Sequence, residues 1–107
     1  MTNRVAWFFL SLAILTEVAG ITCMKLSDGF TRIQPSLLIF AFYAISLSCL
    51  TLSLKRLELG FAYAMWSALG TLLIFLVGAF FFHEPLTIIK TVSLGCIIIG
   101  VLGLKQA

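Results

Sequence analysis

Charged residues are scarce in this 107-residue chain, and their scarcity excludes a soluble globular protein. Only 10% of the residues are charged, whereas 62% are hydrophobic and the mean hydropathy is +1.18. A small soluble domain buries only about 60% of the surface of its chain, which is too little to hide so much apolar surface. The sequence therefore predicts an integral membrane protein that forms a single domain over residues 1–107.

Several chemical signatures are also missing. Cys23, Cys49 and Cys96 show no paired spacing, so we expect neither a disulfide framework nor a zinc site. The sequence has no phosphate-binding loop, catalytic triad or cluster of metal ligands, so we expect no enzyme, no cofactor and no metal. The net charge of +3 comes from basic residues that stand singly or as one pair, which does not suggest a nucleic-acid partner.

What the sequence does have is four apolar segments, separated by charged and turn residues. We expect an all-α membrane protein with spans at Val5–Met24, Pro35–Leu54, Gly60–Phe82 and Leu86–Leu104. The first segment follows an arginine, as a signal peptide would, but it is long and carries a glutamate, so we expect it to be retained.

Basic residues are almost evenly divided between the two sides of the predicted membrane domain. The side with the N-terminus carries four of them and the opposite side carries three. Orientation in a membrane follows the bias of Lys and Arg between loops, and this division is almost no bias. We therefore expect the chain to insert in both orientations.

Glu17 is a lone carboxylate inside the first predicted span. Counting about 1.5 Å per helical residue from Val5 places it roughly 18 Å into a hydrocarbon layer about 30 Å thick. A charge near that depth costs about 2.5–3.5 kcal/mol on insertion scales. We infer that the carboxylate serves chemistry or binding; the alternative is a protonated glutamate that hydrogen-bonds another helix.

The third predicted span carries polar and aromatic residues on one helical face, at positions i, i+3, i+4 and i+7: Tyr63, Trp66, Ser67 and Gly70. Aromatic rings on that face could hold an organic cation by cation–π attraction, worth up to about 2 kcal/mol each. The alternative is an aromatic belt at the membrane interface. Tyr43 on the second span could form another wall of the site, or simply pack in the core.

Small residues mark two further helical faces. Ala13 and Gly20 flank Glu17 on the first span and leave space for a bulky ligand, or else serve close helix contacts. The fourth span carries a stripe of small residues that indicates a protein–protein seam, most simply a dimer interface: Ser93, Cys96, Gly100 and Gly103.

Charged residues next to the spans give weaker signals. We expect Lys25, at the end of the first span, to anchor the helix at the lipid headgroups. We expect His83, Glu84 and Lys90, around the third loop, to be solvated.

Together these residues resemble the small multidrug resistance family of proton-coupled exporters. Three stretches are similar to the family's motifs: EVAGITCMK from Glu17, SDGFTR from Ser27 and GFAYAMWS from Gly60. The resemblance covers essentially the whole chain. One departure is Ala68, which stands where many members have a glycine, so we expect a stiffer kink in the third helix.

The resemblance implies an antiparallel homodimer in the bacterial cell (inner) membrane. The two copies of Glu17 would face one shared pocket that binds protons and a small cationic substrate. Tyr63 and Trp66 would line this site, with a contribution from Tyr43. Some members of the family act as heteromeric pairs, so a different partner chain is a further possibility.

The resemblance also implies a function, namely proton-coupled antiport that exports lipophilic or quaternary ammonium cations by alternating access. Gly20 stands where guanidinium exporters of the family typically have a tryptophan, and Ser67 where they more often have a threonine. Both residues favour the quaternary-ammonium subtype. The alternatives are a guanidinium or polyamine exporter, a non-transporting membrane scaffold subunit, and an ion-conducting channel.

Overall fold

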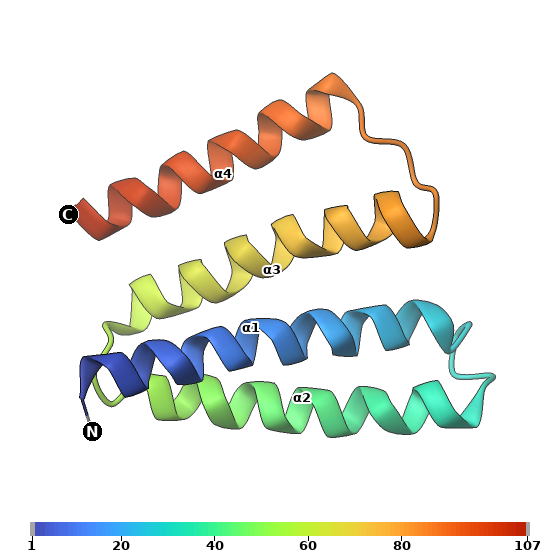
Figure 1. Ribbon diagram of the computed structural model, residues 1–107, viewed down its shortest axis with the longest axis horizontal. Coiled ribbons are helices and arrows are strands. Elements are labelled where there is room, and N and C mark those ends of the chain that lie inside the picture. Colours follow the sequence, from blue (N-terminus) through green and yellow to red (C-terminus); the bar gives the residue numbers. More distant parts are fainter. Residues whose placement is uncertain (1, 107) are drawn as a thin grey trace.

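The computed structural model describes residues 2–106, which form four antiparallel α-helices joined by short loops (Figure 1). The helices are α1 (Asn3–Leu26), α2 (Ile33–Ser53), α3 (Leu59–Phe81) and α4 (Ile88–Gln106). Each is long and apolar enough to cross a membrane, and residues 2–106 contain no β-strand. The predicted all-α membrane fold with four spans is therefore confirmed.

Threonine caps move the start of two helices away from the predicted boundaries. The Thr2 hydroxyl accepts a hydrogen bond from the Val5 N–H at 3.3 Å, and α1 begins at Asn3 instead of Val5. The Thr87 hydroxyl accepts one from the Lys90 N–H at 3.1 Å, and α4 begins at Ile88 instead of Leu86. A side-chain oxygen satisfies an otherwise unpaired N–H of the first helical turn, which fixes where the helix starts.

The loop after α1 is a tight reversal with positive φ angles at Asp28 (49°), Gly29 (70°) and Phe30 (68°). Ser27 holds this turn together. Its hydroxyl donates to the Met24 carbonyl at 2.8 Å and accepts from the Phe30 N–H at 3.3 Å, and the residue is only 1% exposed. This reversal thus depends on a buried serine as well as on Asp28 and Gly29.

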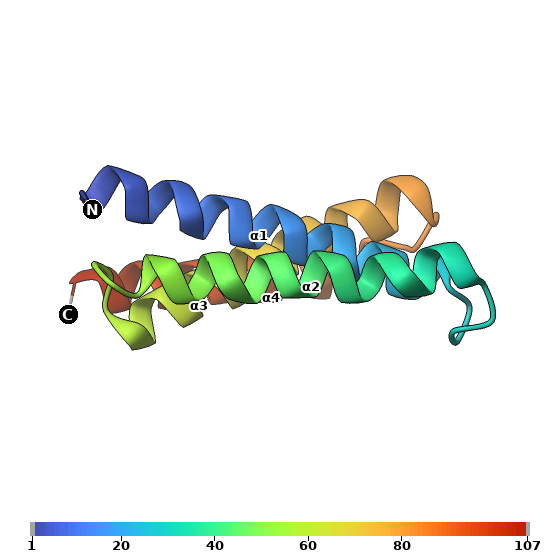
Figure 2. The same cartoon turned by 90° about the horizontal axis from the view of Figure 1, so that it is seen from below.

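The four helices form a flat layer. The molecule measures 41 × 34 × 17 Å, and α1 and α2 make the most extensive helix pair (Figures 1 and 2). α3 packs mainly on α1, and α4 contacts only α3 among the described helices. Val101 is the one buried residue of α4. α4 therefore leaves most of its surface to lipid or to another chain.

The loops alternate between the two ends of the layer. Both termini and the α2–α3 loop lie at one end, and the other two loops lie at the opposite end (Figure 1). The first end carries Arg4, Lys55, Arg56 and Lys105, and the second carries Lys25, Arg32 and Lys90. The arrangement of the helices thus gives the same balance of basic residues as the count from the sequence.

We predict that this balance lets the chain insert in both orientations. In a variant that lacks the native cysteines, Asp28→Cys and Glu58→Cys report on opposite ends of the layer. A membrane-impermeant maleimide applied to intact cells should label the two single-cysteine proteins to a similar extent. A control that carries both Gln106→Lys and Arg32→Gln has a strong charge bias and should be labelled at one end only. Labelling of a single end in the unbiased protein would contradict the prediction.

Candidate functional site

Glu17 is half-buried and its carboxylate rests on the backbone of α3 at Gly70. A Cβ atom added at Gly70 would collide with Glu17 Oε2 and would lie 3.0 Å from Cδ and 3.2 Å from Oε1. Only a residue without a side chain allows this approach. The glycine therefore positions the carboxylate against α3.

One oxygen of this carboxylate lacks a partner. Glu17 Oε2 is buried and accepts no hydrogen bond within the described part of the chain. An unpaired buried polar atom is costly, and one that persists in a native structure calls for an explanation. A proton, a cation or a donor from a second chain would each satisfy this oxygen.

A polar chain connects α3 to α1 through α2. The Trp66 indole N–H donates to Ser46 Oγ at 3.2 Å, and the Ser46 hydroxyl donates to the Ala13 carbonyl at 2.7 Å. Ala13 lies one helical turn before Glu17, and Ser46 is fully buried. These two hydrogen bonds fix the orientation of the Trp66 ring relative to the helix that carries Glu17.

Ser46 was not among the predicted site residues. A serine inside an apolar span is indistinguishable from other small packing residues by composition alone. One signal was available, because Ser46 lies three residues after Tyr43 and shares its helical face.

Tyr63 and Trp66 lie side by side, with ring centroids 5.7 Å apart and ring planes inclined at 45°. Trp66 is half-buried, whereas Tyr63 is 58% exposed. Ser67 is half-buried between Trp66 and Gly70 on the same helix. The structure thus brings Trp66 and Gly70 of the predicted face against α2 and α1, and leaves Tyr63 on the same face exposed. Cation binding by this face stays a prediction.

The space expected beside Gly20 is filled by α2. The Tyr43 Cδ2 and Cε2 atoms lie 2.9 and 3.1 Å from the position that a Cβ at Gly20 would take, and Ala13 is fully buried. Both small residues serve the close approach of α1 and α2, which was the alternative that the sequence allowed. The described chain packs α2 against these two positions, and a part for them in ligand binding stays a prediction.

The small residues predicted to form a seam on α4 lie on its uncovered surface. All four residues of this stripe are exposed: Ser93, Cys96, Gly100 and Gly103. A Cβ added at Gly100 or Gly103 would meet no atom within 4 Å. α3 faces another side of α4, where Thr91, Leu94 and Ile98 help to line an apolar cavity of about 420 Å³. The stripe is thus available for contact, and its use as a dimer seam stays a prediction.

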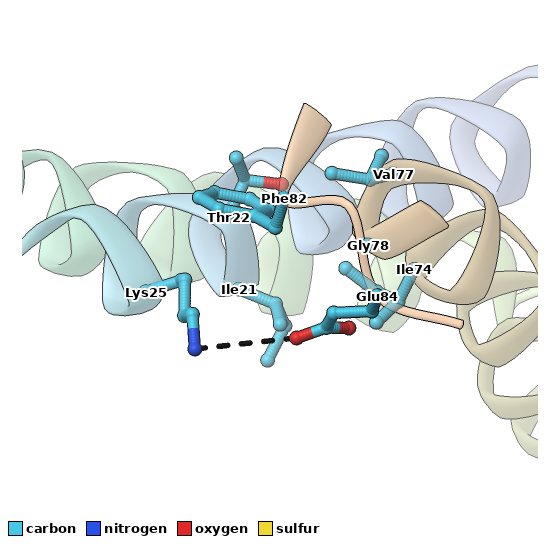
Figure 3. Close-up of a pocket in the computed structure, with 8 residues that line it drawn as sticks. All are labelled: Ile21, Thr22, Lys25, Ile74, Val77, Gly78, Phe82 and Glu84. Atoms are coloured by element: carbon cyan, nitrogen blue, oxygen red, sulfur yellow. Dashed lines mark ion pairs between the residues drawn. The ribbon is translucent and has the colours of Figure 1, made fainter. Parts of the chain in front are cut away.

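A second feature lies along the groove between α1 and α3, at the end that carries the α3–α4 loop. It is a pocket of about 140 Å³ with mostly apolar walls (Figure 3). Lys25 Nζ and Glu84 Oε2 face each other across it at 4.0 Å (Figure 3). Both side chains are more than half exposed, which agrees with the solvated position expected for Glu84. The headgroup contact expected for Lys25 stays a prediction.

Fold and site together define a small four-helix membrane protein with a single carboxylate deep in its first helix. A family model described as Small Multidrug Resistance protein matches residues 5–97. The chain belongs to this family, and it is a multi-pass bacterial membrane protein.

Three relatives illustrate the relationship. The chain is 53% identical over 99 residues to the uncharacterized membrane protein YvaE of Bacillus subtilis, covering 92% of this chain and 83% of the relative. It is 41% identical over 103 residues to the multidrug resistance protein mmr of Mycobacterium leprae, covering 95% and 96%. It is 36% identical over 95 residues to the quaternary ammonium compound-resistance protein QacF of Klebsiella aerogenes, covering 89% and 86%.

We predict that Ser46→Ala releases the Trp66 ring. The substitution removes both hydrogen bonds of the polar chain, each worth about 0.6 kcal/mol on average between membrane helices. In a Trp7→Phe background, where Trp66 is the only tryptophan, the emission maximum and anisotropy of Trp66 should both change. Ser48→Ala, at an exposed position of the same helix, is the matched control. Identical spectra for the two variants would show that Ser46 does not hold the ring.

Proposed function

We propose that this protein exports lipophilic and quaternary ammonium cations in exchange for protons. One observation carries the proposal: a carboxylate inside a membrane-spanning helix has a buried oxygen without a partner in residues 2–106. Intramembrane ionisable residues mark substrate pathways and proton relays. The names of the M. leprae and K. aerogenes relatives support multidrug and quaternary ammonium substrates.

The exchange follows from competition for Glu17. In a low-dielectric site a carboxylate is stabilised either by a bound proton or by a neighbouring cation. Both use the same oxygen atoms, so binding of one displaces the other. A lipophilic cation that loads on one side and a proton that loads on the other then move in opposite directions.

We propose that the functional unit is an antiparallel homodimer. Three features support binding of a second copy of the chain. Tyr63 is exposed on α3, the stripe of small residues on α4 is uncovered, and the layer of helices is flat. Two inverted copies would place both Glu17 carboxylates at one midplane site, where they titrate as a coupled pair. Rocking of the copies around that site gives alternating access. The balance of basic residues supports the inverted insertion that this requires.

Within this site, the aromatic residues would bind the cation. Trp66 is held in place by Ser46, and Tyr63 extends the aromatic surface toward the second copy. Quaternary ammonium groups cannot donate hydrogen bonds, and aromatic faces are the surfaces that recognise them. Tyr43 and Ser67 would complete the walls, and Ala13 and Gly20 would contribute by letting Tyr43 approach α1 within one turn of Glu17.

We predict that Glu17→Gln abolishes proton-coupled transport and leaves a folded protein. The amide keeps the size of the side chain and removes the charge that cation and proton share. The measurement is the transport current of proteoliposomes with a tetra-alkyl ammonium ion, with size-exclusion profiles as a check on folding. Glu58→Gln, in the α2–α3 loop, is the control for loss of one carboxylate.

The result separates the alternatives. Glu17-dependent current with guanidinium alone would assign the chain to another subtype of the family. Silence with every cation would indicate a missing partner chain or a scaffold subunit. A steady current without a substrate gradient would indicate a channel.

We predict that Gly70→Ala weakens cation binding by at least about tenfold. The new methyl group takes the place of the carboxylate, and a shift of a binding group by about one ångström has effects of this order. Gly95→Ala is the matched control, since a Cβ there meets no atom within 4 Å. The measurement is a binding titration of both purified variants. Equal affinities would mean that the contact between Glu17 and Gly70 does not position the carboxylate for binding.

A further inference from the structure

The pocket of Figure 3 is lined by residues of α1 and α3, and the contact between Glu17 and Gly70 also lies between these two helices. On α1, Ile21 and Lys25 follow Glu17 at intervals of four residues, and on α3, Gly78 follows Gly70 by eight. Eight helical residues correspond to about 12 Å. The pocket is thus about two helical turns nearer to the end of the molecule than Glu17 is.

The pocket combines apolar walls with one carboxylate. Ile21, Ile74, Val77 and Phe82 contribute apolar surface, and Glu84 lies at the opening (Figure 3). A dry cavity of about 150 Å³ accepts a benzene ring. The volume of about 140 Å³ is therefore enough for one aromatic ring or for the head of an alkylammonium ion.

Glu84 is held by the end of α3 in a way that resembles the position of Glu17. Its backbone N–H donates to the Gly78 carbonyl at 3.0 Å, after His83 turns the chain with a φ of 55°. Its carboxylate rests on Gly78, where an added Cβ would collide with Oε1. Two glycines of α3 that lie eight residues apart, Gly70 and Gly78, thus each support the carboxylate of a residue outside α3.

The present partner of Glu84 is held weakly. Lys25 lies at 4.0 Å, and the two side chains are 62% and 53% exposed. Exposed ion pairs of this kind contribute little, because water screens the charges and two flexible side chains must be ordered. Another cation could therefore replace the Lys25 ammonium group at small cost.

We propose that Glu84 and the apolar pocket beneath it form an outer binding site for the organic cation. This site rests on the proposed export function and adds an entry step to it. A monovalent cation with one ring or a few alkyl groups displaces Lys25 from Glu84 and places its apolar part between Ile21 and Val77. From there it moves along the groove to Glu17. An ammonium headgroup of a lipid has the same chemistry, so the test uses vesicles and bicelles that lack ammonium lipids.

The first experiment detects the outer site directly. The protein carries Glu17→Gln, which removes the inner carboxylate, and is placed in phosphatidylglycerol bicelles with benzyltrimethylammonium as the probe. The methyl resonances of Ile21, Ile74 and Val77 should shift as the probe is added. A further Glu84→Gln substitution should weaken this binding by up to about fivefold, the upper end of the effect of losing one exposed charge pair.

Asp28→Asn is the matched control for charge. Asp28 lies at the same end of the molecule but does not line the pocket, and asparagine accepts its positive φ. If Asp28→Asn weakens binding as much as Glu84→Gln does, the overall charge of this end is responsible and the proposal is wrong. The absence of methyl shifts in the Glu17→Gln protein would also overturn it.

The second experiment measures transport by proteins that retain Glu17, in phosphatidylglycerol vesicles. Glu84→Gln should raise the KM for benzyltrimethylammonium about fivefold and lower the maximal rate less, whereas Lys25→Gln should lower the KM because the competing ammonium group is gone. A purely structural ion pair predicts changes in the same direction for both variants, and that result would contradict the outer site. Absence of Glu17-dependent current in the wild type would instead count against the export function, whatever the methyl resonances show.

Discussion

The position of one carboxylate in the hydrocarbon layer governs the rest of this structure. Glu17 is brought against α3 by the missing side chain of Gly70, in a place where water cannot solvate it fully. Its surroundings then have to be rigid, because an unpaired charge in a low-dielectric medium gains much from any donor that reaches it. The Trp66 indole N–H donates to Ser46, and the Ser46 hydroxyl donates to the Ala13 carbonyl, so neither donor is directed to Glu17. Glu17 Oε2 therefore stays without a hydrogen-bond partner within residues 2–106.

The flat arrangement of the helices is the second consequence. A closed four-helix bundle would surround Glu17 with its own side chains and leave no path for a ligand. In the layer, α1 and α2 form a tight pair, α3 packs mainly on α1, and α4 lies apart from α1 and α2 (Figure 1). Tyr63 stays exposed at the open side of the site, and the small residues of α4 remain uncovered. The chain thus has the features of half of a site, which is the physical reason to propose a second copy.

The sequence predicted the parts of the fold that depend on hydrophobicity and local turn chemistry. Four long apolar segments are sufficient for four helices. All four helices start one or two residues away from the predicted boundaries, and threonine caps account for the starts of α1 and α4. It also identified Glu17 as unusual, because the cost of a charge in lipid is independent of the packing of the helices. What it could not provide was which helix each small residue meets. A glycine can indicate either space or contact, and Gly20 proved to be a contact with Tyr43. The importance of Ser46 comes from two partners on other helices, which the sequence does not reveal.

The two carboxylates that rest on α3 differ in their surroundings, and this difference bears on the choice of cation. Glu84 is half-exposed and shares its charge with Lys25, so its attraction for another cation is screened by water. Glu17 lies where the same attraction is stronger, because the effective dielectric constant is lower. In the proposed transport, a cation that moves from Glu84 to Glu17 gains this electrostatic energy but loses its water shell. A small, strongly hydrated amine loses more than it gains, whereas a quaternary ammonium ion with apolar substituents has little hydration to lose. Selection of lipophilic cations can therefore arise from the depth of Glu17 in the membrane, without any hydrogen bond that reads the shape of the substrate.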